Sequence, residues 1–388
     1  MIREVSIFIY LLLFRILFSI CKWDGQKEKT IFITYFGCNA SYIVDALEEH
    51  TNQEIIIVTN KNTFVPFYES KRKTVIGLSS FHLIKWVRFI YHLATSKTIM
   101  VDNYYGFLAA TPFKEGTRCI QLWHAAGAIK TFGFEDESVR NRSKGAVRRF
   151  NKVYDRFSHV VVGSDEMADI FNRSFGVEPN RIVKTGIPRT DLFFNEEEQE
   201  EIKEKLYGVF PILRDKKVIL YAPTFRDNHE KEGQYPLDAE TLLHALGSDY
   251  ILMIKNHPVI THTPSEHLEG SVINVSNYKD VNHLLLLTDI LITDYSSIPF
   301  EFSLMEKPMI FYAYDLKEYT QIRGIQGEYR DIVPGPIARN TEDIIKHIQE
   351  NSFDEITIKN YKNKWNKYST GQSSVNLIKK LYKTKERP

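Results

Sequence analysis

The stretch HVVVGSDEMADIFNRSFGVEPNRIVKTG, residues 159–186, decides the fold class. It begins with a short apolar run typical of a buried strand, continues as an amphipathic helix, and ends in a second apolar run. Two strands joined through a helix pair in parallel, and a parallel sheet is covered by helices on both faces. The stretch therefore predicts a doubly wound α/β sheet.

The same alternation extends from residue 27 to residue 186 and resumes after a charged segment at 193–217. The second series contains the runs VILYAPTF, YILMIKNHP, SVINVS, ILITDYSS and PMIFYAY. We expect two doubly wound parallel-sheet domains, at 27–200 and 201–388, after an apolar segment at 1–26. Ligands bind at the carboxyl ends of parallel strands, so we expect these ends to face a cleft between the domains.

The charge and the cysteine and histidine spacing of the chain argue against nucleic-acid binding and metal binding. Among 388 residues, 50 Lys and Arg balance 49 Asp and Glu, so a net charge of +1 gives no global attraction to nucleic acid. The three cysteines have no zinc-binding spacing, and His257, His262 and His267 show no spacing typical of metal ligands. We expect no nucleic-acid partner, no metal and no cofactor.

The N-terminal segment is apolar from Val5 to Trp23 and is interrupted by Arg15. A helix of this length is about 28 Å long, close to the thickness of a hydrocarbon core. Three interpretations of this segment remain open: it lies in the membrane interface, it crosses the membrane, or it is buried or cleaved. The interfacial interpretation is favoured because a crossing helix places Arg15 in mid-membrane. We expect a peripheral protein on the cytoplasmic face of the cell membrane.

A basic row occurs on a later predicted helix, at Lys144, Arg148, Arg149, Lys152 and Arg156. Their spacing places most of them on one face of the helix. The row is either a solvated charged face or a surface for anionic lipid or an acceptor diphosphate.

Polar and cationic residues follow several predicted strands. His124 ends one strand, and the small residues Ala125 to Ala128 come directly after it. A run of small residues lets a ligand approach the backbone closely. The other candidates at strand ends are Arg189, Pro223, Thr224, Lys255, Asn256, His257, Ser296 and Ser297, with Glu301 in the helix that follows the serine pair.

These residue types suit a nucleotide diphosphate and a proton acceptor. In the pair Ser296 and Ser297, one hydroxyl caps the following helix and the other, with free N–H groups, receives an anion. A plain helix cap remains the alternative. Lys255 and His257 add positive charge, and His124 is the candidate base for an acceptor hydroxyl. A structural histidine bonded to a carbonyl remains the alternative for His124.

A set of motifs in a fixed order resembles the CDP-glycerol glycerophosphotransferases of wall teichoic acid synthesis. The motifs are WHAAGAIKTFG, YAPTFRD, KNHP, ITDYSSIPFEF, KPMIFYAYDL and the later VPGPI. The resemblance runs from about residue 100 to residue 340. It implies a GT-B-like fold and transfer of glycerol phosphate from CDP-glycerol with release of CMP. Within the family the chain is most similar to the primases, which use an undecaprenyl-diphosphate-linked N-acetylmannosaminyl-N-acetylglucosamine acceptor.

The resemblance also implies roles for the strand-end residues. His124 and His257 are the expected catalytic residues. The expected CDP-glycerol site consists of His124, Ala125, Ala126, Gly127, Ala128, Arg189, Pro223, Thr224, Lys255, Asn256, His257, Ser296, Ser297 and Glu301. Ala125 stands where the family usually has glycine, which places the backbone path of this loop in question.

Several functions and assemblies remain open at this point. A poly(glycerol phosphate) polymerase or a CDP-ribitol transferase would share these motifs, and a UDP-sugar glycosyltransferase would share the fold. A non-catalytic membrane scaffold with a degenerate transferase fold is the alternative from another class. The sequence is also compatible with a homo-oligomer.

Overall fold

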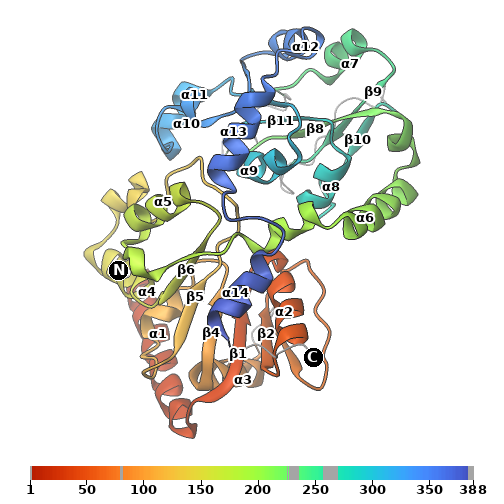
Figure 1. Cartoon of the computed structure of the whole chain (residues 1–388). Helices are drawn as coiled ribbons and strands as arrows, with labels where there is room; N and C mark the ends of the chain where they lie inside the picture. The colour runs from red at the N-terminus through yellow and green to blue at the C-terminus, as the bar shows by residue number, and fades with distance from the viewer. Residues whose placement is uncertain (1, 79–81, 225, 227–235, 257–269, 383–388) are drawn as a thin grey trace. The chain divides into compact units, whose positions relative to one another are not determined.

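The computed structural model describes residues 2–78, 82–224, 226, 236–256 and 270–382. The chain forms two compact units, which are described separately (Figure 1). Unit 1 comprises residues 1–124, 132–191 and 367–388, and unit 2 comprises residues 125–131 and 192–366.

Unit 1 is built on a seven-stranded parallel sheet in the order β3-β2-β1-β4-β5-β6-β7. The order reverses between β1 and β4, which makes this the topological switch point where doubly wound sheets bind ligands. The strands are β1 (Lys27–Ile33), β2 (Glu54–Thr59), β3 (Lys73–Gly77), β4 (Ser96–Val101), β5 (Arg118–Gln121), β6 (His159–Val162) and β7 (Ile182–Lys184).

Helices cover the unit 1 sheet. They are α1 (Ile2–Cys21), α2 (Cys38–His50), α3 (Leu83–Thr95), α4 (Lys144–Tyr154), α5 (Asp165–Phe175) and α14 (Ser373–Leu381), with short 3-10 turns between several elements. The limits of α5 follow from its sequence. The Ser164 hydroxyl accepts a hydrogen bond from the Met167 N–H at 3.1 Å, and Gly176 ends the helix in the left-handed conformation.

Unit 2 repeats this plan with a six-stranded parallel sheet in the order β10-β9-β8-β11-β12-β13. Its order reverses between β8 and β11, so it has a switch point of the same kind. The strands are β8 (Lys217–Ala222), β9 (Tyr250–Ile254), β10 (Val272–Asn274), β11 (Ile290–Thr293), β12 (Met309–Tyr312) and β13 (Ile337–Ala338). The described helices are α6 (Glu196–Val209), α7 (Ala239–Leu246), α8 (Val281–Leu287), α9 (Ile298–Phe302), α10 (Leu316–Arg323), α11 (Tyr329–Ile332), α12 (Thr341–Gln349) and α13 (Glu355–Trp365).

The predicted fold class, two doubly wound α/β domains, is confirmed, but the units are divided differently from the expected 27–200 and 201–388. The C-terminal helix α14 belongs to unit 1, where it lies beside α2 (Figure 1). Leu377, Ile378 and Leu381 are buried there in one cluster with residues of α2 and of the sheet. Residues 125–131 belong to unit 2, although unit 1 precedes and follows them in the chain.

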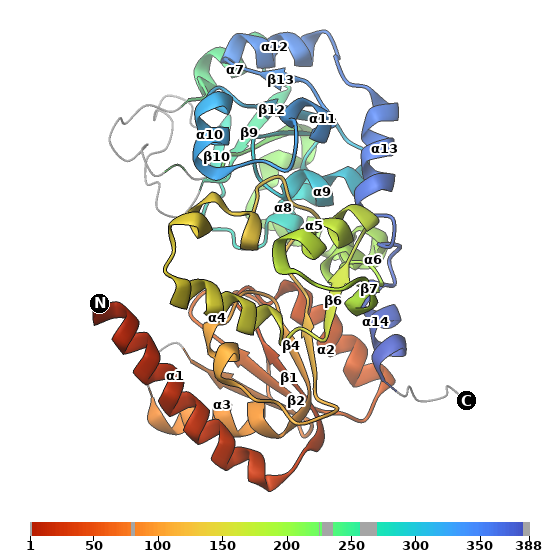
Figure 2. The same ribbon diagram turned by 90° about the vertical axis from the view of Figure 1, so that its left-hand side faces the viewer.

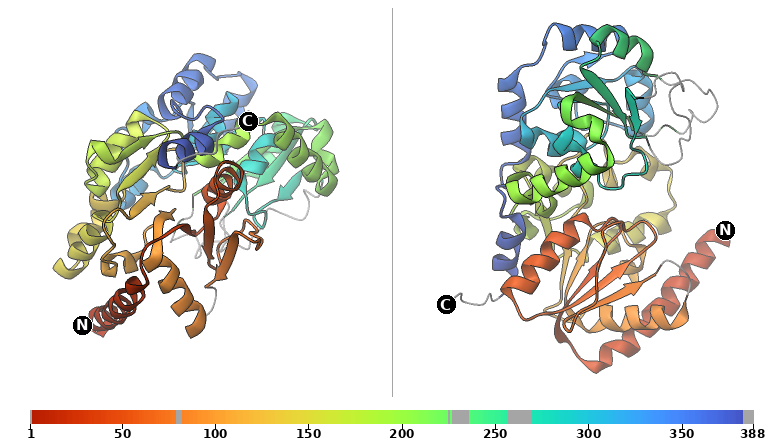
Figure 3. Two further views of the ribbon diagram at one scale, coloured as in Figure 1. Left: turned by 60° about the horizontal axis from the view of Figure 1, so that its bottom comes forward. Right: turned by 90° about the vertical axis from the view of Figure 1, so that its right-hand side faces the viewer.

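The apolar N-terminal segment is a helix that packs on unit 1. Figures 2 and 3 show α1 along the outside of this unit, and Figure 2 shows it beside α3. Phe14 and Phe18 are 3% and 0% exposed, and the Phe14 ring stacks on Phe107 with centroids 5.2 Å apart. By length and composition, Arg3–Asp24 could cross a membrane. One side of the helix is nevertheless committed to contacts within unit 1.

Candidate functional site

An aspartate organises the switch point of unit 1. Asp102 follows β4, is 2% exposed, and accepts hydrogen bonds from the Tyr35 N–H at 2.8 Å and the Thr34 hydroxyl at 2.5 Å. The Tyr105 hydroxyl donates to the same carboxylate at 3.0 Å. These bonds join the ends of β1 and β4, so the loops that follow the two strands are held together.

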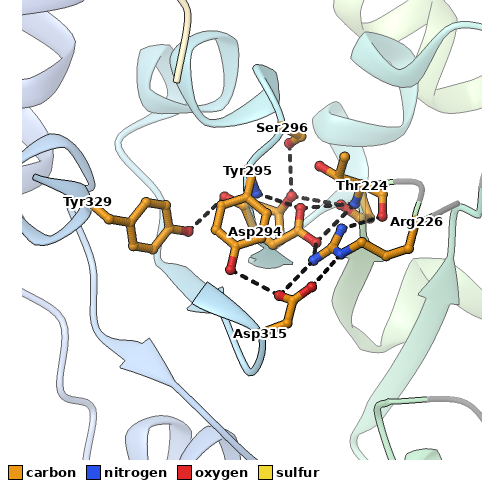
Figure 4. A network of polar contacts seen from close by, with 9 residues as sticks. Thr224, Arg226, Asp294, Tyr295, Ser296, Asp315 and Tyr329 are labelled. Carbon is orange, nitrogen blue, oxygen red and sulfur yellow. Dashed lines mark hydrogen bonds and ion pairs between the residues drawn. The ribbon is translucent and has the colours of Figure 1, made fainter. Parts of the chain in front are cut away.

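An aspartate occupies the corresponding position in unit 2. Asp294 follows β11, is 2% exposed, and accepts a hydrogen bond from the Thr224 N–H at 2.9 Å across the switch point (Figure 4). Arg226 forms ion pairs with Asp294 at 2.9 Å and with Asp315 at 2.6 Å. Burial opposes the charge of Arg226, but the two carboxylates raise its pKa. The sequence has no visible repeat, yet the two units share this strand-end device.

The geometry of His124 fixes its protonation. Its Nδ1 lies 3.0 Å from the backbone carbonyl oxygen of Asp102. A carbonyl oxygen can only accept, so Nδ1 carries the hydrogen and Nε2 keeps the lone pair. Burial is the main cause that lowers the pKa of His124, and the nearby Arg189 acts in the same direction. The ring is therefore a neutral imidazole at pH 7, and its Nε2, which has no hydrogen-bond partner among the described residues, can take a proton.

The turn that presents His124 is strained. Trp123 has a φ of 58°, in the left-handed region that a bulky residue seldom adopts. Its N–H donates to the Gln121 side chain at 2.9 Å, and its ring packs with Phe132, Phe171 and Phe175. The indole also stacks on the His124 ring with centroids 4.2 Å apart. Unit 1 thus holds the imidazole in place through the residue before it.

Asn39 is a site residue that sequence reasoning missed. It is 3% exposed, and its amide donates to the Trp123 carbonyl oxygen at 2.8 Å while its oxygen accepts the Arg189 N–H at 3.0 Å. The structure therefore brings His124 and Arg189 into one neighbourhood of unit 1, as their positions at strand ends suggested. The available signal was that FGCNAS also follows a strand, β1.

The segment after His124 is anchored within unit 2. Ala125 and Ala126 are 3% and 0% exposed, and the Ala126 N–H donates to the Glu301 carboxylate at 2.9 Å. A Cβ on Gly127 would lie 2.4 Å from the Phe300 ring. The small residues thus make room for unit 2 side chains, and the close approach of a ligand to this backbone stays a prediction. Glu301 anchors this loop through its hydrogen bond to Ala126, and its expected place in the CDP-glycerol site stays a prediction.

The two serine hydroxyls have different hydrogen-bond environments. The Ser296 hydroxyl accepts the Ile298 N–H at 3.3 Å and bonds the Thr293 hydroxyl at 2.9 Å, so Ser296 caps the turn. The half-buried Ser297 hydroxyl makes no hydrogen bond with any residue that the structure describes. The helix behind the pair, α9, has only five residues, so its dipole contributes little to anion binding.

Other expected residues lie at the same strand ends of unit 2. The Lys255 ammonium donates to the Ser276 carbonyl oxygen at 3.0 Å, and burial lowers its pKa. The Asn256 N–H donates to the Ser276 hydroxyl at 3.0 Å. Pro223 and Thr224 follow β8, and the buried Thr224 hydroxyl has no partner among the described residues. His257 lies outside the described residues, as do His262 and His267.

A comparison with protein families decides the class of this chain. The family model described as CDP-Glycerol:Poly(glycerophosphate) glycerophosphotransferase matches residues 17–383. The chain belongs to the CDP-glycerol glycerophosphotransferase family. It is therefore an enzyme of the phosphotransferase class, as its motifs indicated.

Individual members of the glycerophosphotransferase family are similar along most of the chain. The teichoic acid glycerol-phosphate primase of Bacillus subtilis strain 168 is 39% identical over 92% of both chains. The teichoic acid poly(ribitol-phosphate) polymerase of Bacillus spizizenii strain W23 is 38% identical over 68% of this chain and 43% of its own. A solved variant of the wall teichoic acid polymerase TagF is 25% identical, with a TM-score of 0.80, over 98% of this chain and 96% of that one.

The described residues of this glycerophosphotransferase include a neutral imidazole and several cations but no candidate metal centre. No group of three His, Cys, Asp or Glu among them could hold a metal ion. Unit 1 contains the imidazole of His124 with Arg189 nearby. Unit 2, described by itself, contains Lys255 and the hydroxyls of Thr224 and Ser297. These groups suit proton removal from an alcohol and binding of phosphate oxygens.

Proposed function

We propose that this enzyme transfers glycerol phosphate from CDP-glycerol to a lipid-linked disaccharide and releases CMP, as the priming step of wall teichoic acid synthesis. The acceptor is N-acetylmannosaminyl-N-acetylglucosaminyl diphospho-undecaprenol. One observation carries the proposal: the similarity to a glycerol-phosphate primase extends over 92% of both chains. The similarity to a ribitol-phosphate polymerase extends over only 43% of that enzyme.

Unit 1 supplies the acceptor side of the reaction in this proposal. The acceptor hydroxyl gives its proton to His124 Nε2, and its oxygen attacks the phosphorus that carries glycerol. The new O–P bond forms as the bond between this phosphorus and the bridging oxygen breaks, so CMP leaves with that oxygen. The hydrogen bond from Nδ1 to the Asp102 carbonyl oxygen at 3.0 Å supports this role, because it directs the lone pair to Nε2.

Unit 2 supplies the donor side. The two phosphates of CDP-glycerol bind to residues at the strand ends of this unit, with Pro223 beside them. These residues are Thr224, Lys255, Asn256, His257, Ser296 and Ser297. Arg189 of unit 1 contributes a further positive charge. Charge develops on the bridging oxygen as CMP leaves, and fixed donors and cations stabilise that charge.

The expected product is a lipid-linked disaccharide that carries a single glycerol phosphate. Purified enzyme is incubated with CDP-glycerol or CDP-ribitol and a synthetic lipid-linked disaccharide, and the products are read by mass spectrometry. Many added units would indicate a polymerase, and growth with CDP-ribitol alone would indicate a ribitol-phosphate transferase. An unchanged acceptor with both donors would refute the proposal in favour of a scaffold.

We further propose that unit 1 docks on the membrane surface through α1 and the start of α3. The side of α1 opposite Phe14 and Phe18 is apolar and exposed. Its large residues are Val5, Phe8, Ile9, Leu12, Leu13, Ile16 and Ile20, and α3 adds Leu83, Ile84 and Val87. A helix packed on its protein by one side and apolar on the other suits the interface better than a span.

Cations border this apolar face. Arg149 of α4 pairs with Glu4 of α1 at 2.6 Å, and Arg156 donates to the Leu108 carbonyl oxygen, so both have structural roles. Lys144, Arg148 and Lys152 remain exposed and are spaced four residues apart along α4. They favour anionic headgroups beside an inserted apolar face, each contributing about 1 kcal/mol.

We expect Phe8→Ser with Leu13→Ser to weaken vesicle binding about 10-fold or more, because both side chains are exposed in the folded unit and would be buried in lipid. Reversing the charge of Lys144, Arg148 and Lys152 should weaken binding only to anionic vesicles. Reversal of Lys346, Lys359 and Lys364, exposed on α12 and α13, is the matched control. Sedimentation with vesicles measures the effect, and wild-type binding by both variants would contradict this docking surface.

A further inference from the structure

Lys130 lies on the segment of unit 2 that follows the histidine loop. Residues 129–131 run antiparallel to residues 324–326, where the Gln326 N–H donates to the Ile129 carbonyl oxygen at 2.8 Å. The Thr131 hydroxyl donates to the Arg323 carbonyl oxygen at 3.1 Å. This pairing fixes the backbone of Lys130, so its side chain projects from a defined position.

The Lys130 side chain reaches the strand-end network described above. Its ammonium lies 5.7 Å from the centre of the Tyr319 ring, and that ring stacks on Tyr295 at 3.8 Å with an interplanar angle of 13°. Tyr295 directly precedes the serine pair. Lys130 therefore contacts a pair of stacked rings, one of which belongs to the residue before Ser296.

This ammonium has no hydrogen-bond acceptor among the described residues, although it is half-buried. The nearby carboxylates are engaged elsewhere: Asp294 binds Thr224 and Arg226, and Asp315 binds Arg226 and Tyr295. An ammonium withdrawn from water without acceptors is costly, and a bound anion would remove that cost.

We propose that Lys130 binds a phosphate of the donor and is a binding residue of the CDP-glycerol site. The inference rests on the proposed function, since it takes a nucleoside diphosphate ester as the anion. A charge-assisted contact of this kind holds the donor without taking part in proton transfer. His124 and Lys130 then place the base and a phosphate ligand six residues apart on one loop.

The charges around Lys130 predict a pH dependence. Burial lowers its pKa to about 8, with Arg226 and Arg323 acting in the same direction and Asp294 opposing them. The free enzyme therefore loses this positive charge as the pH rises through 8, whereas a bound phosphate keeps the lysine protonated. We expect wild-type affinity for CDP-glycerol to fall about tenfold between pH 7 and pH 9.

The test is titration calorimetry of CDP-glycerol into wild type, Lys130→Met and Lys317→Met. Lys317 is exposed on α10, the helix that carries Tyr319, and is the matched control. Lys130→Met should bind CDP-glycerol about 10- to 100-fold more weakly at pH 7 and lack most of the change between pH 7 and pH 9. Displacement by cytidine, which has no phosphate, should be unchanged.

The outcomes separate this inference from the proposed function. If wild type binds CDP-glycerol and Lys130→Met binds it within twofold, the inference on Lys130 fails alone. An equal loss of cytidine affinity would make Lys130 a structural residue, which also overturns it. A wild-type enzyme that binds no CDP-glycerol would overturn the proposed function as well. Lys130→Arg keeps its charge at pH 9 and should lose less CDP-glycerol affinity than wild type between pH 7 and pH 9, so a misfolded Lys130→Met still leaves a decisive measurement.

Discussion

Replacing His124 with alanine is expected to lower turnover about 100-fold or more, because the acceptor hydroxyl loses its base. The Nδ1 hydrogen bond to the Asp102 carbonyl oxygen and the buried, neutral ring support Nε2 as the proton acceptor. The variant should keep its affinity for CDP-glycerol within about threefold, because the proposed phosphate ligands of unit 2 are untouched. Steady-state kinetics with both substrates varied measures the two effects.

The pH profile gives a second readout of the same residue. The base form of His124 exists above its pKa, and burial lowers that pKa below the ordinary value of 6.5. Wild-type turnover should stay level through pH 7 and fall only in more acidic buffer, and His124→Ala should lack this acidic limb.

His159→Ala is the matched control for His124→Ala. His159 begins β6, at the opposite end of the same sheet, and we expect nearly wild-type turnover from its variant. Wild-type turnover by His124→Ala, with donor affinity retained, would show that the base lies elsewhere.

Replacing Arg226 with methionine is expected to destabilise unit 2 by about 3–5 kcal/mol. The side chains of Arg226 and Asp294 are 9% and 2% exposed, and Asp315 is the second partner of the guanidinium (Figure 4). The variant leaves two carboxylates in the interior without their countercharge. Hydrogen exchange of the β8 and β11 amides measures the opening of unit 2 separately from unit 1.

The loss of unfolding free energy caused by Arg226→Met should be larger at neutral pH than in acid. In wild type, burial opposes the charge of Asp315, but Arg226 lowers its pKa, so its contribution to stability is lost as the pH falls. In the variant, burial of Asp315 is no longer offset by Arg226 and raises the pKa of that carboxyl, so its protonation restores stability in acid. The difference between the two proteins is therefore largest near neutral pH and shrinks below about pH 5.

Arg214→Met provides the contrast for Arg226→Met. Arg214 pairs with Glu204 at 2.8 Å, but both side chains are about half exposed, so its loss should cost about 0.5 kcal/mol. Equal effects of the two substitutions would remove the argument that the buried network holds the switch point together.

The sequence predicted the sheets because buried parallel strands are continuous apolar runs. Residues 55–58 and 290–292 are fully apolar and almost completely buried, and both runs are strands. The edge strands β3 and β13 escaped prediction: β3 has one buried residue among five, and β13 has only two residues. The apolar face of α14 was visible, but an apolar face does not say which sheet it covers.

The site was predictable where chemistry follows a strand and unpredictable where it depends on packing. His124 and the serine pair stood out because polar residues directly follow apolar runs. Asn39 did not, because its role is to bond two loops that lie 84 and 150 residues away from it in the chain. The proposed role of Lys130 was hidden because a lysine in a loop is usually solvated, and only the fold shows its ammonium half-buried against Tyr319.

The assignment of residues 125–131 to unit 2 limits how this enzyme can be dissected. A fragment that begins after residue 191 would lack the backbone N–H that Glu301 binds and would uncover the Phe300 ring opposite Gly127. Such a fragment would also carry α14 without the unit 1 sheet on which α14 packs. Truncation between the two halves of the sequence is therefore unsuited to isolating either unit. A chimera with a related enzyme should exchange residues 125–131 together with the second half of the chain.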